Sequence, residues 1–164
     1  MLPLVTVQWW RPYTPGRGRW LIIGWELGGL ALAHWSTVRL FDITGAGVAL
    51  LGAALGALWL LGSWRIIRMG VYVSEYGVRI YGLAGSRTLR WRDIAEIALD
   101  QPVFRLGSWS LPNGTRVLIK HRNGEFVNTS LWAQGIDFHA QPRVFREVYG
   151  LLQERHIAAL AAGA

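Results

Sequence analysis

The sequence predicts an α+β protein in which two apolar helices precede a run of short antiparallel strands and a C-terminal helix. Leu, Ala, Gly and Trp dominate residues 1–69, whereas residues 70–164 have the polar content of a soluble domain. Beyond residue 70, apolar and polar side chains alternate with a period of two between glycines, as in a half-buried antiparallel sheet. The period becomes helical near Pro142. We therefore expect a membrane part, residues 1–69, and a soluble part, residues 70–164.

The net charge of +7 is distributed unevenly over the 164 residues. Six arginines and two acidic residues precede residue 70, and the longer remainder contributes an excess of only three positive charges. Because most of the basic surplus flanks apolar segments, where membrane topology requires it, the charge does not indicate a nucleic-acid partner. The chain contains no cysteine, which excludes disulfides and thiol chemistry.

Residues 1–19 combine Trp9, Trp10 and three arginines with turn-forming proline and glycine. Tryptophan and arginine are favoured at the depth of lipid headgroups, which predicts an interfacial lead-in to the first helix. A frayed tail fits the same composition, and the residues do not separate the two interpretations.

Residues 20–40 provide roughly the 20 residues needed to cross a bilayer core and are predicted to form the first membrane span. This segment contains Glu26 and His34. A charge at the centre of a membrane helix costs about 2.5–3.5 kcal/mol on insertion scales, and Glu26 lies nearer the entry end, where the cost is lower. We expect Glu26 to be structural, either snorkelling or protonated and hydrogen-bonded to a neighbouring helix. A proton relay would need a second titratable partner at similar depth, which the second span lacks.

Residues 44–63 carry no charge and are predicted to form the second span. The connection between the spans is too short for a domain, which predicts a tight helical hairpin. One pair of glycines in each span fits the small-xxx-small pattern that lets membrane helices approach closely. The candidate residues for packing within the membrane, against each other or against a partner, are Gly24, Glu26, Gly28, Gly52 and Gly56.

Arginines flank both outer ends of the expected hairpin, and the connecting loop has one arginine offset by one aspartate. The positive-inside rule then places both termini in the cytoplasm, in a multi-pass protein. An alternative interpretation is a cleaved signal peptide, which the arginines, the apolar run and Ala31-Leu32-Ala33 imitate. Glu26 within the apolar run argues against cleavage. Even after cleavage, Arg65 and Arg68 would hold the soluble part on the cytoplasmic side.

Seven strands are expected in the soluble part, separated by turns that contain glycine, proline or asparagine. Asn123-Gly124 is a strong signal for a two-residue hairpin turn, because both central positions of that turn need positive φ. Further turns are expected at Tyr76-Gly77, Ala84-Gly85 and Pro112-Asn113-Gly114. The expected strands are residues 71–73, 78–82, 87–91, 94–99, 103–109, 115–121 and 126–130.

The final segment has the periodicity of an amphipathic helix from Pro142 to about residue 161. Val144, Val148 and Leu152 mark its apolar stripe. Proline suits the first turn of a helix, because its missing N–H would have no partner there.

Seven strands followed by one amphipathic helix resemble a pleckstrin-homology-like (PH-like) domain. More narrowly, two apolar helices followed by GVYVSEYGVRIYGLAGSRTLRWRDIAEI resemble the membrane-anchored group typified by the low-molecular-weight protein antigen of actinobacteria. The local match comprises the GVRI strand, the small-residue turn Gly85-Ser86-Arg87, Trp91 and Asp93-Ile94. The resemblance implies a seven-stranded antiparallel β-sandwich or partly open barrel capped by a C-terminal helix, at a bacterial plasma membrane. That group has no established general activity, so the resemblance implies a fold more than a function.

Period-two alternation places polar and basic side chains on one face of the second and third expected strands, namely those of Arg79, Tyr81, Thr88 and Arg90. Arginine binds phosphate bidentately, so this face is a candidate surface for an anionic lipid or a protein partner, and a solvated sheet face is the alternative. The first strand lacks the basic residues that phosphoinositide-binding members of the wider fold place there, which argues against specific phosphoinositide recognition. The candidate residues are Arg79, Tyr81, Arg87, Arg90 and Arg92.

No catalytic or metal-binding constellation is evident. Trp91 is expected to anchor the core, with Asp93 accepting backbone hydrogen bonds at a turn. The four histidines lack the spacing of metal ligands, and no nucleophile motif, P-loop or dinucleotide fingerprint occurs. We therefore expect neither an enzyme nor a bound cofactor or metal.

The sequence favours a non-enzymatic membrane protein that presents its soluble domain to a protein partner within a membrane complex, through open sheet edges suited to adding a peptide strand. One alternative is a surface module for anionic lipid, with scattered arginines that each contribute about 1 kcal/mol near the surface. Another is an accessory subunit that acts through Glu26 or the glycine faces of its hairpin.

Overall fold

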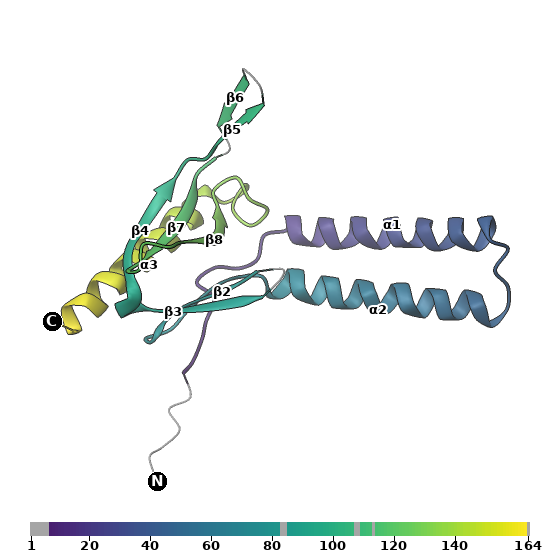
Figure 1. The fold of residues 1–164 in the computed structure, drawn as a ribbon, viewed down its shortest axis with the longest axis horizontal. Coiled ribbons are helices and arrows are strands. Elements are labelled where there is room, and N and C mark those ends of the chain that lie inside the picture. The colour runs from purple at the N-terminus through teal and green to yellow at the C-terminus, as the bar shows by residue number, and fades with distance from the viewer. Residues whose placement is uncertain (1–6, 83–84, 107–108, 113, 164) are drawn as a thin grey trace, which may run out of the picture. The chain divides into compact units, whose positions relative to one another are not determined.

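A computed structural model describes residues 7–82, 85–106, 109–112 and 114–163, with the backbone alone for residues 103–112 (Figure 1). The chain forms two compact units. One comprises residues 15–68, and the other combines residues 7–14 with residues 69–163. The sequence assigned residues 7–14 to the membrane part, whereas the structure places them in the soluble unit.

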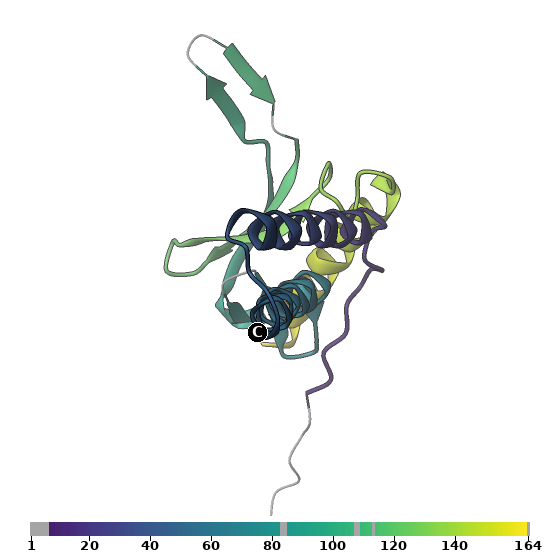
Figure 2. The same cartoon turned by 90° about the vertical axis from the view of Figure 1, so that its right-hand side faces the viewer.

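The helical unit consists of two antiparallel helices, α1 (Gly18–Leu40) and α2 (Ala46–Arg68), which lie side by side (Figures 1 and 2). Neither helix contains proline, and leucine and alanine favour helical backbone. In the short turn between them, Gly45 adopts a φ of +59°. α2 continues for more than a turn beyond its expected end at residue 63, because no helix-breaking residue follows until Gly70.

Side-chain hydrogen bonds join the two helices. The guanidinium of Arg19, in the first turn of α1, donates to the carbonyl oxygens of Ile66 and Ile67 in the last turn of α2. Those carbonyl groups have no partner within α2, so Arg19 caps the helix and its charge complements the helix dipole. The indole N–H of Trp59 donates to the carbonyl oxygen of Ile23 at 3.2 Å. Arg19 is 2% exposed, which makes this cap a buried contact.

α2 is the one helix, among the residues that the structure describes, that is long and apolar enough to cross a membrane. α1 has the same length, but Glu26, His34 and several tryptophans and glycines lower its hydropathy. Of the two expected membrane spans, the structure therefore supports only the second, which corresponds to α2.

The soluble unit contains two three-stranded antiparallel sheets and a separate hairpin. The first sheet has the order β1–β2–β3 and the second β4–β7–β8, while β5 pairs with β6. A short 3-10 helix, η1 (Trp91–Asp93), precedes β4, and α3 (Pro142–Ala162) ends the unit with proline in its first turn, as expected. The strands are β1 (Gly70–Val73), β2 (Gly77–Tyr81), β3 (Ser86–Arg90), β4 (Ile94–Asp100), β5 (Val103–Leu106), β6 (Trp109–Pro112), β7 (Arg116–His121) and β8 (Phe126–Trp132).

The expected seven-stranded barrel is wrong in two respects. The described residues form eight strands, and these are divided among three sheets. The fifth expected strand, residues 103–109, is in fact parts of two strands, β5 and β6. The signal for this division is present in the sequence, because a Gly-Ser pair, Gly107-Ser108, separates the two apolar runs and suits a two-residue hairpin. Both residues of the pair lie outside the described part of the chain.

The Asn123-Gly124 turn also differs from its expected type. Only Gly124 of the two has positive φ, at +88°. The N–H of His121 donates to the carbonyl oxygen of Glu125, which leaves a three-residue loop between them. A type I turn followed by a left-handed residue is the usual form of such a loop. The turns expected at Ala84-Gly85 and Pro112-Asn113-Gly114 include residues outside the described ones.

One hydrophobic core includes inward side chains from both three-stranded sheets and from α3. Val78 and Leu89 of the first sheet, Trp91, and Val148 and Leu152 of α3 are each at most 4% exposed. The inward alternation of β2 and β3 and the apolar stripe of α3 are therefore confirmed. The indole N–H of Trp91 donates to a backbone carbonyl of the β1–β2 turn at 3.0 Å, so Trp91 anchors the core as expected.

The segment before α1 extends the first sheet. The N–H of Trp10 donates to the carbonyl oxygen of Val73 at 3.1 Å, and the N–H of Val73 donates back to Trp10 at 2.8 Å. Tyr13 is 7% exposed, and its ring centroid lies 4.8 Å from that of Phe138. The expected interfacial lead-in is therefore, in its described part, an edge of the soluble unit. The chain enters α1 from this edge and returns from α2 into β1, the neighbouring strand.

Replacement of Tyr13 by alanine is expected to destabilise the soluble unit by about 3 kcal/mol, because it removes a buried aromatic ring. Tyr13→Phe keeps the ring and loses the hydroxyl, which accepts a hydrogen bond from the N–H of Val71 at 3.4 Å. That loss should cost about 1 kcal/mol or less. Chemical denaturation of the full chain in detergent, followed by near-UV circular dichroism, measures both effects. Val7→Ala, at a half-exposed position, is the control, and a Tyr13→Ala variant as stable as this control would contradict the placement of the segment.

Candidate functional site

The outer face of the first sheet carries most of the candidate residues. In the register of the sheet, Tyr72 of β1 lies opposite Arg79 of β2, which lies opposite Thr88 of β3. The Nε of Arg79 donates to the hydroxyl of Thr88 at 2.9 Å. Tyr81 and Arg90 share this face because residues two apart in a strand point the same way. The alternation predicted for these strands is therefore confirmed.

Arginines on this face lie over aromatic rings. The guanidinium of Arg79 lies 4.5 Å from the ring centroid of Trp9, and that of Arg11 lies 4.9 Å from the centroid of Tyr72. The Tyr72 ring in turn packs edge-on against Tyr81, with 5.1 Å between centroids. Each cation–π contact contributes about 0.5–1 kcal/mol at an exposed site. Arg79 and Tyr81 therefore belong to a packed surface shared with the N-terminal segment.

Arg90 and Arg92 have looser contacts within the chain. The guanidinium of Arg90 lies 5.1 Å from the centroid of the Tyr76 ring. The Nε of Arg92 lies 3.8 Å from a carboxylate oxygen of Asp93, and the Arg92 side chain is 73% exposed. A single long contact between exposed charges adds little stability, so Arg92 is available to an external anion.

Arg87 does not share the face of the other candidates. It lies opposite Ile80, a core residue, in the register of the sheet. Its two Nη atoms donate hydrogen bonds of 2.5 and 2.6 Å to the carboxylate oxygens of Glu125, beside the β7–β8 turn. This ion pair connects the first sheet to the second. The hydrogen bond from Arg87 lowers the pKa of the Glu125 carboxyl to about 2, and Glu125 raises the pKa of Arg87. The charge of Arg87 is thus already paired within the domain.

The hydrogen bonds of the first sheet show which backbone groups of β3 face β2. The N–H of Gly82 donates to Gly85 at 2.8 Å, and the N–H of Trp91 donates to Tyr76 at 3.3 Å, at the two ends of this pairing. Hydrogen-bonded and non-hydrogen-bonded pairs alternate along an antiparallel ladder. Between these two ends, every second residue of β3 therefore bonds to β2, and the residues between them direct their N–H and C=O groups away.

The outward-directed groups belong to Ser86, Thr88 and Arg90. No described strand pairs with this side of β3. The opposite edge of the same sheet differs, because the outward N–H groups of Val73 and Val71 bond to the N-terminal segment. An unpaired edge is a template for another strand. The structure therefore leaves one edge of the first sheet open and closes the other.

A cavity of about 580 Å³ lies beside the β1–β2 turn. Its lining combines one carboxylate, one guanidinium and one amide with apolar and hydroxyl side chains. The described part of the chain also holds no group of three His, Cys, Asp or Glu side chains that could bind a metal ion. The lining residues are Val7, Gln8, Trp10, Ser74, Glu75, Tyr76 and Arg155.

The candidate packing residues of the helices divide into two groups. A Cβ at Gly52 would lie 3.4 Å from the ring of His34, so α1 covers this glycine. At Gly24, Gly28 and Gly56, a Cβ would meet nothing within 4 Å. Glu26 is exposed too, but it lies two residues from Gly24 and from Gly28 and so does not share their face of α1. The small-xxx-small patterns therefore do not join α1 to α2, except at Gly52.

Sequence reasoning missed the part that the N-terminal segment plays in the site. Trp9 and Arg11 cover the outer face of the first sheet, and Tyr13 enters the core. The available signal was the density of large aromatic residues just before the helix, which is high for a frayed tail. The same density fits a membrane interface, so the sequence alone did not reveal a strand.

Comparison with known proteins gives no further information on this site. No protein-family model matches the chain, and no curated protein and no solved structure matches it either.

The Arg87–Glu125 pair should make stability fall in acid. The Glu125 carboxyl has a pKa of about 2 in the folded chain, against an ordinary value of 4.5, so the unfolded state takes up this proton more readily. The contribution of the pair is therefore complete above the ordinary pKa and is lost as the pH falls from there towards 2. Arg87→Gln should flatten this part of the profile of thermal midpoint against pH. Arg92→Gln should keep the wild-type slope, and an unchanged slope in Arg87→Gln would contradict the assignment.

Proposed function

We propose that this chain is a non-enzymatic membrane protein whose PH-like unit binds a protein partner at the cytoplasmic face of a bacterial plasma membrane. The partner adds an extended segment to the open edge of β3. The observation that carries this proposal is the row of unpaired backbone groups at Ser86, Thr88 and Arg90, which matches what strand addition requires.

The charges around β3 favour an acidic segment. Arg90 and Arg92 have only weak contacts within the chain and lie at the end of this edge, whereas Arg87 is neutralised by Glu125. Like charges also repel, so two copies of the chain do not pair readily through β3. The arrangement therefore combines attraction for an acidic partner with resistance to self-association.

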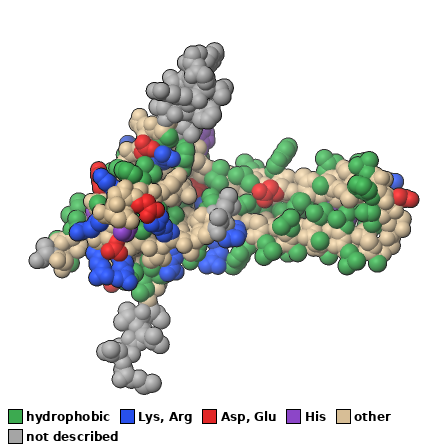
Figure 3. Space-filling model, in the orientation of Figure 1, with side chains coloured by type: hydrophobic (Ala, Val, Ile, Leu, Met, Phe, Trp, Pro, Cys, Tyr) green, Lys and Arg blue, Asp and Glu red, His purple; other side chains and the backbone are tan. Residues whose placement is uncertain are grey.

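The membrane attachment in this proposal involves both helices. α2 has the apolarity of a span, and α1 packs along it through Arg19 and the bond between Trp59 and Ile23. At 1.5 Å per residue, each 23-residue helix is about 35 Å long, enough for a hydrocarbon core of about 30 Å. Trp25 is 85% exposed, and hydrophobic side chains line both helices (Figure 3). Such a surface requires an apolar surrounding.

Cysteine labelling should place the loop and the soluble unit on opposite sides of the membrane. The chain has no cysteine, so Thr44→Cys in the loop and Asn123→Cys in the β7–β8 turn each introduce a single thiol. With both termini in the cytoplasm, a membrane-impermeant maleimide should label the first variant in intact cells and the second only after lysis. Labelling of both in intact cells, or of neither, would contradict the two-span hairpin.

Proline at position 88 should abolish partner binding. Thr88→Pro removes an outward N–H without breaking a bond to β2, because proline is tolerated on an edge strand whose N–H faces away from the sheet. Thr88→Val is the matched control, which keeps the N–H and a β-branched side chain. Affinity purification of the full chain from native membranes, with mass spectrometry of co-eluting proteins, should recover a stoichiometric partner with wild type and Thr88→Val but not with Thr88→Pro.

The other outcomes of this purification assign the function elsewhere. A partner that survives Thr88→Pro but is lost in Gly28→Leu would place the interaction on the open face of α1. The exposure of Arg90 and Arg92 favours anionic lipid as the second candidate. If lipid were the ligand, charge reversal at both arginines would abolish binding to anionic vesicles, and Thr88→Pro would leave that binding intact.

A further inference from the structure

The cavity beside the β1–β2 turn is lined by two charged side chains of opposite sign. Glu75 belongs to the turn, and Arg155 belongs to α3. Both residues are exposed. Neither forms a hydrogen bond or an ion pair with another residue that the structure describes. Their charges are therefore available to a ligand in the cavity.

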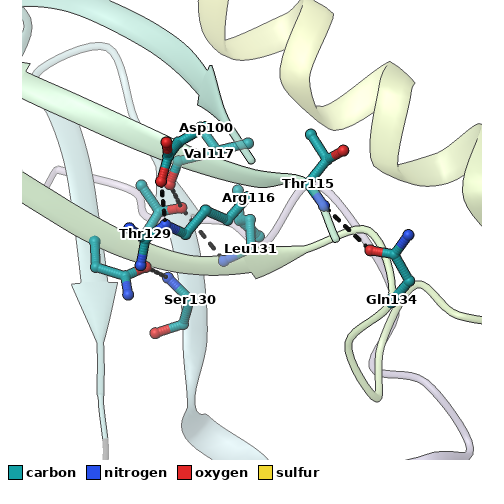
Figure 4. Close-up of polar contacts among 9 residues, drawn as sticks. Asp100, Thr115, Arg116, Val117, Thr129, Ser130, Leu131 and Gln134 are labelled. Atoms are coloured by element: carbon teal, nitrogen blue, oxygen red, sulfur yellow. Dashed lines mark hydrogen bonds and ion pairs between the residues drawn. The ribbon is translucent and has the colours of Figure 1, made fainter. Parts of the chain in front are cut away.

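Other unlike charges of the soluble unit pair directly. The Nε of Arg116 donates to a carboxylate oxygen of Asp100 at 2.7 Å (Figure 4), and an ion pair also joins β3 to the β7–β8 turn. Glu75 and Arg155 line one cavity without such a pair. Two unlike charges that line one space without meeting leave a gap. A molecule that carries one charge of each sign can bridge this gap with charge-assisted hydrogen bonds.

Apolar side chains contribute much of the remaining lining. Val7, Trp10 and Tyr76 are each between 40% and 42% exposed. Aromatic rings such as these favour packing against another ring. An apolar wall with a few placed polar groups is the composition of a small-molecule site. The cavity volume of about 580 Å³ also lies within the usual range of such sites, about 300–1,000 Å³.

Hydrogen bonds fix two walls of the cavity. The hydroxyl of Ser74 accepts hydrogen bonds from the N–H groups of Tyr76 and Gly77, both at 3.2 Å. These bonds fix the turn that carries Glu75. The reciprocal backbone hydrogen bonds between Trp10 and β1 hold the N-terminal segment in place. The turn and the N-terminal segment therefore keep their positions without a ligand.

The third wall, α3, is fixed where it carries Arg155. A ring nitrogen of His156, which is 7% exposed, lies 3.0 Å from the carbonyl oxygen of Ile94 in β4. Leu152, one helical turn earlier, is fully buried in the core. The backbone beneath both charges is thus in place before a ligand binds. Preorganisation of this kind lowers the ordering cost of binding.

We propose that this cavity binds a small zwitterion with an aromatic or apolar body, the class to which the aromatic α-amino acids belong. The ammonium group of the ligand pairs with Glu75, and its carboxylate pairs with Arg155. Its ring packs against Trp10 and Tyr76. A ligand with a single charge leaves one charge of the cavity desolvated without a partner, which is unfavourable. All the lining residues belong to the soluble unit, so the inference is independent of the membrane attachment and of strand addition at β3.

Fluorine NMR of para-fluoro-L-phenylalanine tests the cavity. The resonance of the probe should broaden with the full chain in detergent, beyond its width with detergent micelles alone, and L-phenylalanine should displace the probe. Phenylpropanoate lacks the ammonium group, and phenylethylamine lacks the carboxylate. Each should need an about tenfold higher concentration than phenylalanine for displacement, because it lacks one charge-assisted hydrogen bond. Glycine, which lacks the ring, should not displace the probe at the concentration at which phenylalanine does.

Substitutions assign each charge of the ligand to its partner. Glu75→Gln should abolish the preference for phenylalanine over phenylpropanoate and keep the preference over phenylethylamine. Arg155→Gln should show the reverse pattern. Both residues are exposed and unpaired among the described residues, so the thermal midpoint should stay at the wild-type value. Glu154→Gln, at the neighbouring exposed position of α3, is the matched control and should bind as the wild type does.

Three results would overturn the inference. One is a probe resonance that the full chain does not broaden beyond the micelle control. Another is displacement by phenylpropanoate or phenylethylamine at the same concentration as phenylalanine, because one charge of the cavity then has no part in binding. The third is binding by Glu75→Gln and Arg155→Gln with the preferences of the wild type, which places the ligand elsewhere on the chain.

Discussion

The pairing of Trp10 with Val73 is the contact on which the other features of the soluble unit depend. It places the segment before α1 beside the strand after α2, so the two chain connections of the helical unit meet at one sheet edge. The same pairing places Trp9 and Arg11 over the outer face of the sheet and fills the β1 edge. Because that edge is closed from within the chain, β3 is the edge of the first sheet that can receive another strand.

Arginines with the same charge have different roles here, and their partners explain the difference. Arg19 is buried and caps a helix, and Arg87 is held by a bidentate contact with Glu125 that connects two sheets. Arg79 is fixed between an indole ring and a threonine hydroxyl. A guanidinium held on several sides has little freedom to bind a ligand, whereas Arg92 has one long contact with its neighbour. Position in the sheet and available partners, more than charge, decide which arginine can serve recognition.

Sequence periodicity was sufficient to predict features that depend on residues close together in the sequence. The alternation of Val78 with Arg79 assigned both faces of β2, and the apolar repeat of the last segment located α3. Contacts between distant residues had no such signal. Val71 and Tyr13 are 58 residues apart, and Arg87 and Glu125 are 38 residues apart. No local sequence pattern indicates either contact. The division of the sheets likewise depends on how strands pair at long range. The succession of strands along the chain could be read from the sequence, except for the split of residues 103–109 into β5 and β6, but their pairing into three sheets could not.

α1 shows what hydropathy alone leaves out of account in the membrane attachment proposed for this chain. Judged alone, its composition falls short of a span, because Glu26 and His34 lower its hydropathy. In the proposed attachment, contacts with α2 compensate for this low hydropathy. His34 packs over Gly52, and the carbonyl oxygen of Ile23 accepts a bond from α2. A helix that arrives in the membrane together with a more apolar helix needs less hydropathy of its own, since packing and shared hydrogen bonds replace part of the favourable transfer to lipid. Gly24 and Gly28, four residues apart on one uncovered face of α1, would then lie where a further membrane helix could approach closely, whereas Glu26 lies on the opposite face of α1.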